Sequence, residues 1–166
     1  MLMGIPVSKY ASLDLEGIGP LNDAVGGITL TAIETIDKFV KGETITLWGE
    51  DAMHYVRSRE HYTVSADAGR QARQRQYIEA FIKKAVEKAK SNFSFVQSFY
   101  NTAQSYSLTN VTLDEFTYLA SSAISSNFVF GDFSTVPGTY SAYGENAAYN
   151  INQTGLFELI LDIYYK

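Results

Sequence analysis

The sequence predicts a mixed α/β fold in which a mixed β-sheet is flanked by helices. A strand-like alternation at 10–15 and an apolar strand candidate at 28–32 enclose a helix candidate at 18–25, which is the order of an α/β unit. Residues 78–89 repeat apolar side chains at the spacing of one helix face. Because 46% of the 166 residues are hydrophobic and 19% are charged, we expect one globular domain over 1–166.

The first half of the chain contains three helix candidates. The first, at 18–25, is closed by Gly26-Gly27. The second, at 49–56, ends just before Arg57 and Arg59, which we expect on an extended exit. The third is the longest and runs from about Asp67, a plausible N-cap, to about Ser91, with lysines opposite its apolar face.

The second half alternates polar stretches with short elements. Residues 92–110 are rich in Ser, Asn, Gln and Tyr, and their aromatic side chains suit either a pocket border or the core. Thr112 and Glu115 form a capping box for a helix through about Ser125. Strands at 127–136 and 149–151, a Pro137-Gly138 turn and a last helix capped by Asn152 complete the prediction.

Composition excludes several classes of function. A net charge of −5 disfavours general binding to nucleic acid, which depends on many cations displacing counterions from phosphates. The absence of cysteine excludes disulfides, thiolate nucleophiles and Cys-based metal sites. Because no run of about 18 apolar residues occurs, we expect the chain as written to be soluble and without a membrane span.

The arginines form a positive island in an acidic chain. All five of them fall between Arg57 and Arg75, a window that contains no lysine and only Glu60 and Asp67 as acids. The window therefore carries a net +3, and the remainder of the chain −8. Arginine presents a planar fork of donors that matches phosphate oxygens, and the start of the long helix adds free N–H groups. Together these groups could hold a pyrophosphate.

Structural interpretations of this window, without a ligand, remain open. Arginines at helix ends commonly form weak surface ion pairs, for which Glu60, Asp67 and Glu79 are available. His54 and His61 lack partners at metal-ligand spacing, and we expect both to be ordinary surface or interface residues. No helix in the pattern is typical of DNA reading.

Two segments of the chain carry a family resemblance. Residues 47–59 read LWGEDAMHYVRSR, and residues 67–74 read DAGRQARQ. Together they resemble the two-part signature of the LytR-CpsA-Psr family, L-x-G-x-x-A-x-x-Y-V-R-x-R followed by D-x-G-R-x-x-R-Q. The stretches 4–10, 21–28 and 136–138 and the final helix are also similar to that family, so the resemblance covers essentially the whole chain.

The resemblance implies a phosphotransferase of the cell envelope, held at the outer face of the membrane by an N-terminal anchor. Such a protein would bind a polyprenyl-pyrophosphate-linked glycan, with its lipid in a hydrophobic pocket, and pass the glycan phosphate to peptidoglycan. The pyrophosphate would be bound by arginines and a glutamine of the signature, and Asp67 would hold the arginines in place or assist Mg²⁺. By position the resemblance implies that the binding residues are Arg57, Arg59, Arg70, Arg73 and Gln74, and that Arg57, Arg59, Arg70 and Asp67 are the catalytic residues.

The chain also departs from the family pattern. It opens at the family's mid-domain G-I-P segment, so the expected fold is the C-terminal portion of the domain, incomplete relative to the whole. The earlier half, absent here, would supply the acids that hold Mg²⁺, so no metal ligand is assigned to this chain. We therefore expect a phosphate site without turnover by this chain alone. A non-catalytic module that binds polyprenyl phosphate or another anion is the alternative.

Overall fold

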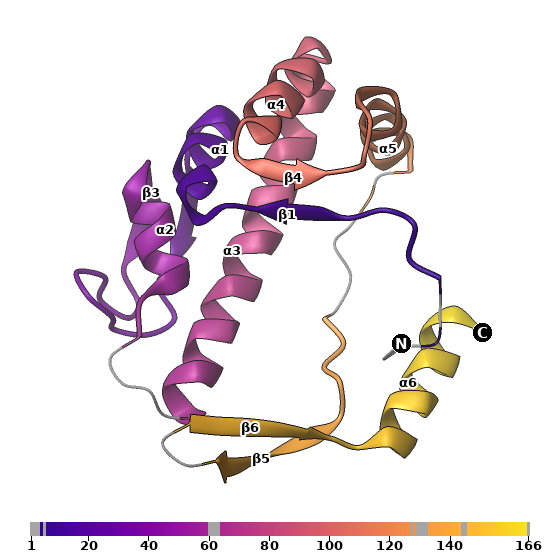
Figure 1. Cartoon of the computed structure of the whole chain (residues 1–166). Coiled ribbons are helices and arrows are strands. Elements are labelled where there is room, and N and C mark those ends of the chain that lie inside the picture. The colour runs from indigo at the N-terminus through magenta and orange to yellow at the C-terminus, as the bar shows by residue number, and fades with distance from the viewer. Residues whose placement is uncertain are drawn as a thin grey trace.

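A computed structural model provides the structure of the chain. It describes Gly4, residues 6–59, 64–126, Phe128, 133–143 and 146–165, and at 64–67, 142–143 and 146–147 it describes the backbone alone. The elements follow one another as β1 (Ala11–Leu13), the 3₁₀ helix η1 (Leu15–Gly17), α1 (Ile18–Val25), β2 (Ile28–Thr31), β3 (Thr44–Leu47), α2 (Glu50–Arg57), α3 (Val64–Ser91), α4 (Ser94–Gln104), β4 (Ser107–Thr109), α5 (Leu113–Ser125), β5 (Gly138–Tyr143), β6 (Asn146–Ile151) and α6 (Gln153–Tyr164) (Figure 1).

The predicted mixed α/β class is confirmed, but the predicted mixed β-sheet is wrong, because the strands of the described residues form three separate two-stranded antiparallel sheets. The two strands that flank α1 do not pair with each other: β1 pairs with β4, and β2 pairs with β3. Gly26 and Gly27 both have positive φ, 99° and 72°, so they reverse the chain after α1. Consequently β2 forms a sheet with the strand that follows it, and the segment 10–32 is not a parallel α/β unit.

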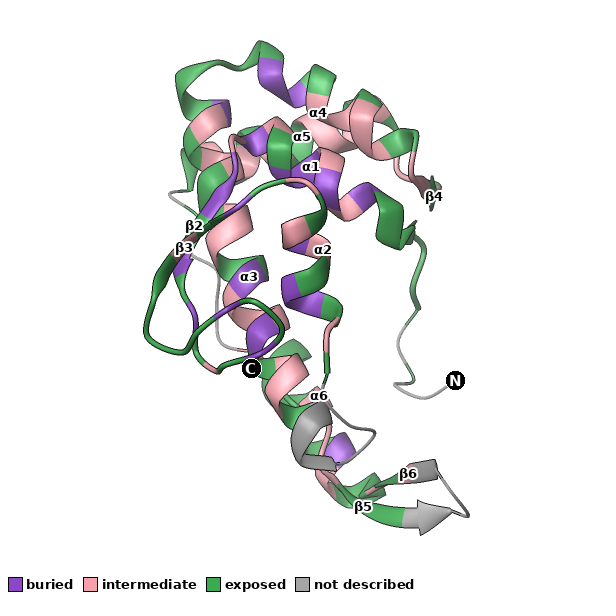
Figure 2. Ribbon diagram, turned by 90° about the vertical axis from the view of Figure 1, so that its left-hand side faces the viewer, coloured by how far each residue is buried: buried purple, intermediate pink, exposed green. Residues whose placement is uncertain are grey.

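Helix α3, 28 residues long, is the element around which the others gather. In Figure 2 the buried residues are concentrated where α1, α2, β2 and β3 surround it. The apolar cluster formed there includes Val25, Ile28, Leu47, Tyr55 and Tyr77. Burial of these side chains, typically about 1.5–3 kcal/mol for a large apolar residue, accounts for the strength of this part of the fold.

The long helix begins earlier than its expected N-cap. It starts at Val64 and therefore includes Asp67 in its first turn. Ala66 and Ala68, which have the highest intrinsic helix propensity, favour this extension. Asp67 is thus not the N-cap.

Three predicted helices appear with the expected ends. Helix α1 occupies the predicted range and is closed by Gly26 in a left-handed conformation. Thr112 and Glu115 form both bonds of a capping box at the start of α5, and the Asn152 side chain accepts the N–H of Gly155 at the start of α6.

Several elements were not predicted, namely α4, β3, β4 and β5. Helix α4 falls in the polar, aromatic stretch 92–110, and its Phe95 and Val96 are buried in the core cluster. The predicted strand at 127–136 lies partly outside the described residues, and its described part at 133–136 is not a strand.

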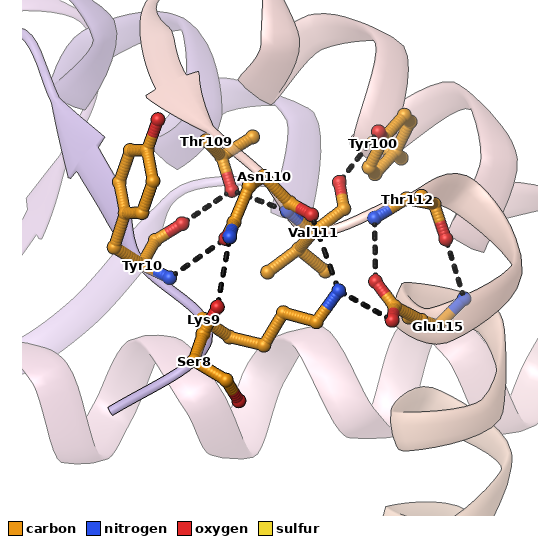
Figure 3. A network of polar contacts seen from close by, with 9 residues as sticks. All are labelled: Ser8, Lys9, Tyr10, Tyr100, Thr109, Asn110, Val111, Thr112 and Glu115. Atoms are coloured by element: carbon orange, nitrogen blue, oxygen red, sulfur yellow. Dashed lines mark hydrogen bonds and ion pairs between the residues drawn. The ribbon is translucent and has the colours of Figure 1, made fainter. Parts of the chain in front are cut away.

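A polar network joins the N-terminal segment to the loop before α5 (Figure 3). Asn110 is its centre: its side chain accepts the N–H of Tyr10 at 2.9 Å and donates to the Ser8 carbonyl at 2.8 Å. Lys9 adds an ion pair with Glu115, 2.5 Å apart. These bonds join segments about a hundred positions apart in sequence, and they hold β1 beside β4.

Candidate functional site

Helix α2 carries Arg57, the first arginine of the signature, to the site. Its start is fixed by the N–H of Gly49, which donates to Asp23 Oδ1 at 2.7 Å, and by the close approach of Gly19, where an added Cβ would lie 2.9 Å from the Gly49 carbonyl oxygen. Its end is Arg57, followed by Ser58 in an extended conformation (φ −58°, ψ 144°). The predicted extended exit is confirmed from Ser58 onward, but the expectation for Arg57 was wrong, because Arg57 is the last residue of the helix.

The C-terminal end of α2 is held by side chains of α3. The last carbonyls of a helix lack partners within it, and here two groups of α3 supply donors. Gln74 Nε2 donates to the Val56 carbonyl at 3.1 Å. The Arg73 guanidinium donates to the carbonyls of Tyr55 and Ser58.

A cavity of about 490 Å³ opens beside this junction. Its polar lining consists of Arg57, Arg70 and Gln74, and its other walls are apolar. The apolar walls come from four segments of the chain: Leu13, Leu15, Ile18, Leu21, Val56, Tyr77, Ile78 and Phe81. A cavity of this size with a few convergent polar groups is typical of small-molecule sites.

The cavity changes character along α3. Arg70, Gln74, Tyr77, Ile78 and Phe81 have the spacing of one helix face, and along it the lining passes from cationic to aromatic. The eleven residue steps from Arg70 to Phe81 span about 16 Å of helix. This gradient suits a ligand with an anionic head and an apolar tail.

Phe81 also borders a second cavity, of about 270 Å³, whose lining residues are all apolar. They include Phe95 and Phe99 of the aromatic stretch that was expected to border a pocket or to join the core. The structure places Phe95 in the core and both residues in this lining. A chain of ring contacts links Tyr77, Phe81, Phe99 and Phe116.

Arg57 faces a third cavity as well, of about 700 Å³, whose lining contains four carboxylates: Asp14, Glu16, Asp23 and Glu50. Carboxylates are the ligands that Mg²⁺ prefers. Within the described residues, however, no group of three or more acids or histidines has the arrangement that could hold a metal ion.

The structure brings three of the predicted ligand residues together at one cavity: Arg57, Arg70 and Gln74. Arg59 is exposed two residues beyond Arg57 and is not among the described lining residues. The side chain of Asp67 lies outside the described residues.

Arg73 requires a correction, because we expected it to contact the pyrophosphate. It is 1% exposed, and its Nε lies 2.5 Å from Glu34 Oε1. Its remaining bonds go to the backbone at the end of α2. Three positions after Arg70, it faces the core on a different side of α3.

His54 does not line the cavity that contains Arg57, Arg70 and Gln74. His54 is half exposed, with its Nδ1 3.5 Å from Asp37 Oδ2, as expected of a surface residue. His61 lies outside the described residues.

Sequence reasoning missed a buried polar pair below the cavity. The Tyr77 hydroxyl donates to Asn22 Oδ1 at 3.1 Å, and Asn22 Nδ2 donates to the Leu47 carbonyl at 2.8 Å. Burial, reinforced by the charge of Asp23, raises the pKa of the Tyr77 phenol, so the hydroxyl stays a neutral donor. A tyrosine inside an apolar helix face was the only sequence signal for this pair.

Comparison with known proteins identifies the family. The model of the LytR_cpsA_psr family matches residues 1–160. The chain belongs to the LytR-CpsA-Psr family. Its members include the polyisoprenyl-teichoic acid–peptidoglycan teichoic acid transferase TagU of Bacillus licheniformis, 32% identical over 120 residues. The cell wall biosynthesis protein LcpA of Corynebacterium glutamicum is 34% identical over 90 residues, which are 51% of this chain and 17% of LcpA.

Solved structures of similar proteins have the same fold. Lin1025 of Listeria innocua is 34% identical with a TM-score of 0.68, covering 96% of this chain and 70% of that one. TagV of Bacillus subtilis is 26% identical with a TM-score of 0.74, covering 97% and 65%. The TagU match covers 68% of this LytR-CpsA-Psr chain and 37% of TagU. The chain thus spans little more than a third of that curated relative. No helix in the described part of the chain has the length and apolarity to cross a membrane.

Proposed function

We propose that this chain forms the ligand-binding portion of a cell-envelope glycopolymer phosphotransferase. Its ligand would be a polyprenyl-pyrophosphate-linked glycan, and the acceptor would be peptidoglycan. The proposal is supported by the TagU relative, whose name states a transfer of teichoic acid from a polyisoprenyl carrier to peptidoglycan. The observation that carries it is the 490 Å³ cavity, whose lining is cationic at one end and apolar at the other.

The geometry suits such an amphiphile. Arg57 and Arg70 come from two different helices, so a pyrophosphate between them would be bound by two guanidinium forks, each capable of bidentate hydrogen bonds. The lipid would extend along α3 toward Phe81, where the apolar walls favour its transfer out of water.

In the reaction we propose, a peptidoglycan sugar hydroxyl attacks the phosphorus that carries the glycan and forms a P–O bond to it. The bridging P–O bond of the pyrophosphate breaks, polyprenyl phosphate leaves, and the hydroxyl proton passes to solvent or to the leaving phosphate. Charge builds on the phosphate oxygens during such a transfer, and fixed cations stabilise it. Arg57 lines both the 490 Å³ cavity and the 700 Å³ cavity that contains the four carboxylates. The carboxylate oxygens of the 700 Å³ cavity suit the hydroxyls of an acceptor sugar. The outer face of the cell membrane is the location that accords with these substrates.

A titration of farnesyl pyrophosphate, a short soluble analogue, tests the site. We expect Arg70→Ala to weaken binding at least about tenfold, because one of the two phosphate forks is lost. Arg75→Ala is the matched control: its guanidinium donates to Thr135 at 2.6 Å and is not among the lining residues. Equal affinity of wild type and Arg70→Ala would contradict the proposed site.

A binding module that holds the carrier lipid without transferring it is the second candidate. The observation that favours it is the lining of the 490 Å³ cavity, whose cationic and apolar groups account for binding of an amphiphile and not for its transfer. Addition of Mg²⁺ and an acceptor oligosaccharide to the loaded protein separates the two, because a binding module gives no product at any Mg²⁺ concentration.

A further inference from the structure

Arg73 occupies an unusual position for a charged residue. It lies on α3 between the cavity residues Arg70 and Gln74, yet it is 1% exposed and is absent from the described cavity lining. A buried charge is tolerated only where it is paired and hydrogen-bonded. Glu34 supplies the pairing, 2.5 Å from Arg73 Nε, from the segment that joins β2 to β3.

The hydrogen bonds of Arg73 lie on both sides of Arg57, the residue that we propose binds the phosphate. The guanidinium donates to the carbonyl of Tyr55 and to that of Ser58, and these two residues flank Val56 and Arg57. Gln74 holds the Val56 carbonyl between them. The backbone is therefore fixed on both sides of Arg57, whose own side chain is exposed and lines the cavity.

Glu34 fits its place because α3 has a glycine opposite it. A Cβ added at Gly69 would lie 2.7 Å from Glu34 Oε2, so any larger residue there would displace the carboxylate. This contact gives a physical reason for the glycine in the segment DAGRQARQ. It connects Glu34, outside both signature segments, with the helix that carries Arg70.

We propose that Glu34 and Arg73 are a positioning pair that orients Arg57 toward the ligand phosphate. Glu34 neutralises and aims the buried guanidinium, and Arg73 holds the two carbonyls on either side of Arg57. Neither residue touches the ligand. This inference rests on the proposed function, since it assumes that Arg57 binds a phosphate.

The test compares a charged with an uncharged amphiphile. Affinities for farnesyl pyrophosphate and for farnesol are measured for wild type, Arg73→Lys and Glu34→Gln, together with thermal unfolding of each protein. Lysine keeps the charge of Arg73 but lacks the planar fork whose two nitrogens each bind one of the two carbonyls, so it does not reproduce that geometry. Glutamine keeps an acceptor oxygen and removes the charge. Glu43→Gln, at an exposed carboxylate of the same β2–β3 segment, is the matched control.

We expect Arg73→Lys to bind farnesyl pyrophosphate about tenfold more weakly and Glu34→Gln severalfold more weakly, because small displacements of a positioned group have large effects on the interactions it makes. Farnesol affinity should stay within about twofold, because the apolar walls are untouched. General loosening of the fold would weaken both ligands alike, and that result would overturn the pair.

The outcome also separates this inference from the proposed function. If wild type binds farnesyl pyrophosphate and Arg70→Ala does not, while both pair variants bind it like Glu43→Gln, the positioning pair is wrong and the phosphate site stands. If the wild type does not bind farnesyl pyrophosphate, both the proposed function and the positioning pair are wrong. Should Arg73→Lys fail to fold, Glu34→Gln decides alone, since its carboxylate is 38% exposed and its replacement leaves no buried cavity.

Discussion

At the scale of single residues, the fold depends on a few polar side chains that satisfy buried backbone groups. Asn22 is fully buried, and its amide joins the Tyr77 hydroxyl on α3 to the Leu47 carbonyl at the end of β3. Such bonds contribute modestly when made, and their loss is costly when a partner is left unpaired.

Tyr77→Phe removes the hydroxyl that donates to Asn22 Oδ1. We expect the free energy of unfolding to fall by about 1–2 kcal/mol, because a buried acceptor loses a donor. Chemical denaturation measures this loss. Tyr118→Phe, at a tyrosine that is 72% exposed, should change stability by less than about 0.5 kcal/mol, and an equal loss in both variants would contradict the role of the buried pair.

The contacts of Glu115 make the free energy of unfolding depend on pH. Its hydrogen bond with Lys9, together with the N–H of Thr112, lowers the pKa of the Glu115 carboxyl below its ordinary value of 4.5. A lowered pKa stabilises the folded state above the unfolded-state pKa, and this contribution disappears as the pH falls through the folded-state value. Wild type should therefore lose its advantage over Glu115→Gln as the pH falls from about 6 to about 3. Unfolding curves over this range that keep a constant difference would exclude the effect.

At the scale of elements, segments far apart in the sequence form the walls of the 490 Å³ cavity. The β1–η1 segment contributes Leu13 and Leu15 to its wall, although β1 is only three residues long. A strand so short needs bonds outside its own ladder, and Asn110 supplies two of them (Figure 3).

Asn110→Ala should loosen the wall formed by Leu13 and Leu15. We expect a stability loss of about 1–2 kcal/mol for the two hydrogen bonds and a weaker affinity for farnesol, measured by calorimetry. Asn101→Ala, at an exposed asparagine on α4, is the control. Unaltered farnesol binding by Asn110→Ala would show that β1 keeps its place without this network.

At the scale of the whole molecule, two regions differ in how they are held. Among the described residues, the buried members of the core cluster come from β2, β3, α1 to α4 and their connections and end at Val96. Phe116, Ala120 and Ile124 of α5 pack against the cluster. The segment 133–165 touches α3 through Arg75 with Thr135 and Phe133, and through Gln71 with Tyr140. Its last helix exposes Phe157 and Tyr164.

Hydrogen exchange should therefore divide the molecule. Amides of β5, β6 and α6 should exchange through local opening, at free energies well below those of α3, because few buried apolar contacts oppose that opening. Arg75→Ala should accelerate exchange in β5 and β6 and leave α3 unchanged. A single protection level along the chain would show that the two regions unfold together.

Local signals in the sequence were sufficient where structure depends on neighbouring residues. The turn after α1 follows from Gly26-Gly27, the start of α5 from Thr112 and Glu115, and the extended exit from α2 was expected from its position. The strand partners were not predictable, because the Ala11↔Thr109 pairing joins residues far apart in the chain and has no local signature.

The sequence by itself determined that the arginines cluster, that a long helix carries several of them, and that two segments of the chain resemble the LytR-CpsA-Psr signature. Only the tertiary structure decided what each arginine does. Arg70 and Arg73 are three positions apart on α3, yet Arg70 lines the cavity and Arg73 is buried against Glu34. The reason is physical: a side chain's role depends on what packs against its face of the helix, and Glu34, 39 positions away, is brought there by the fold.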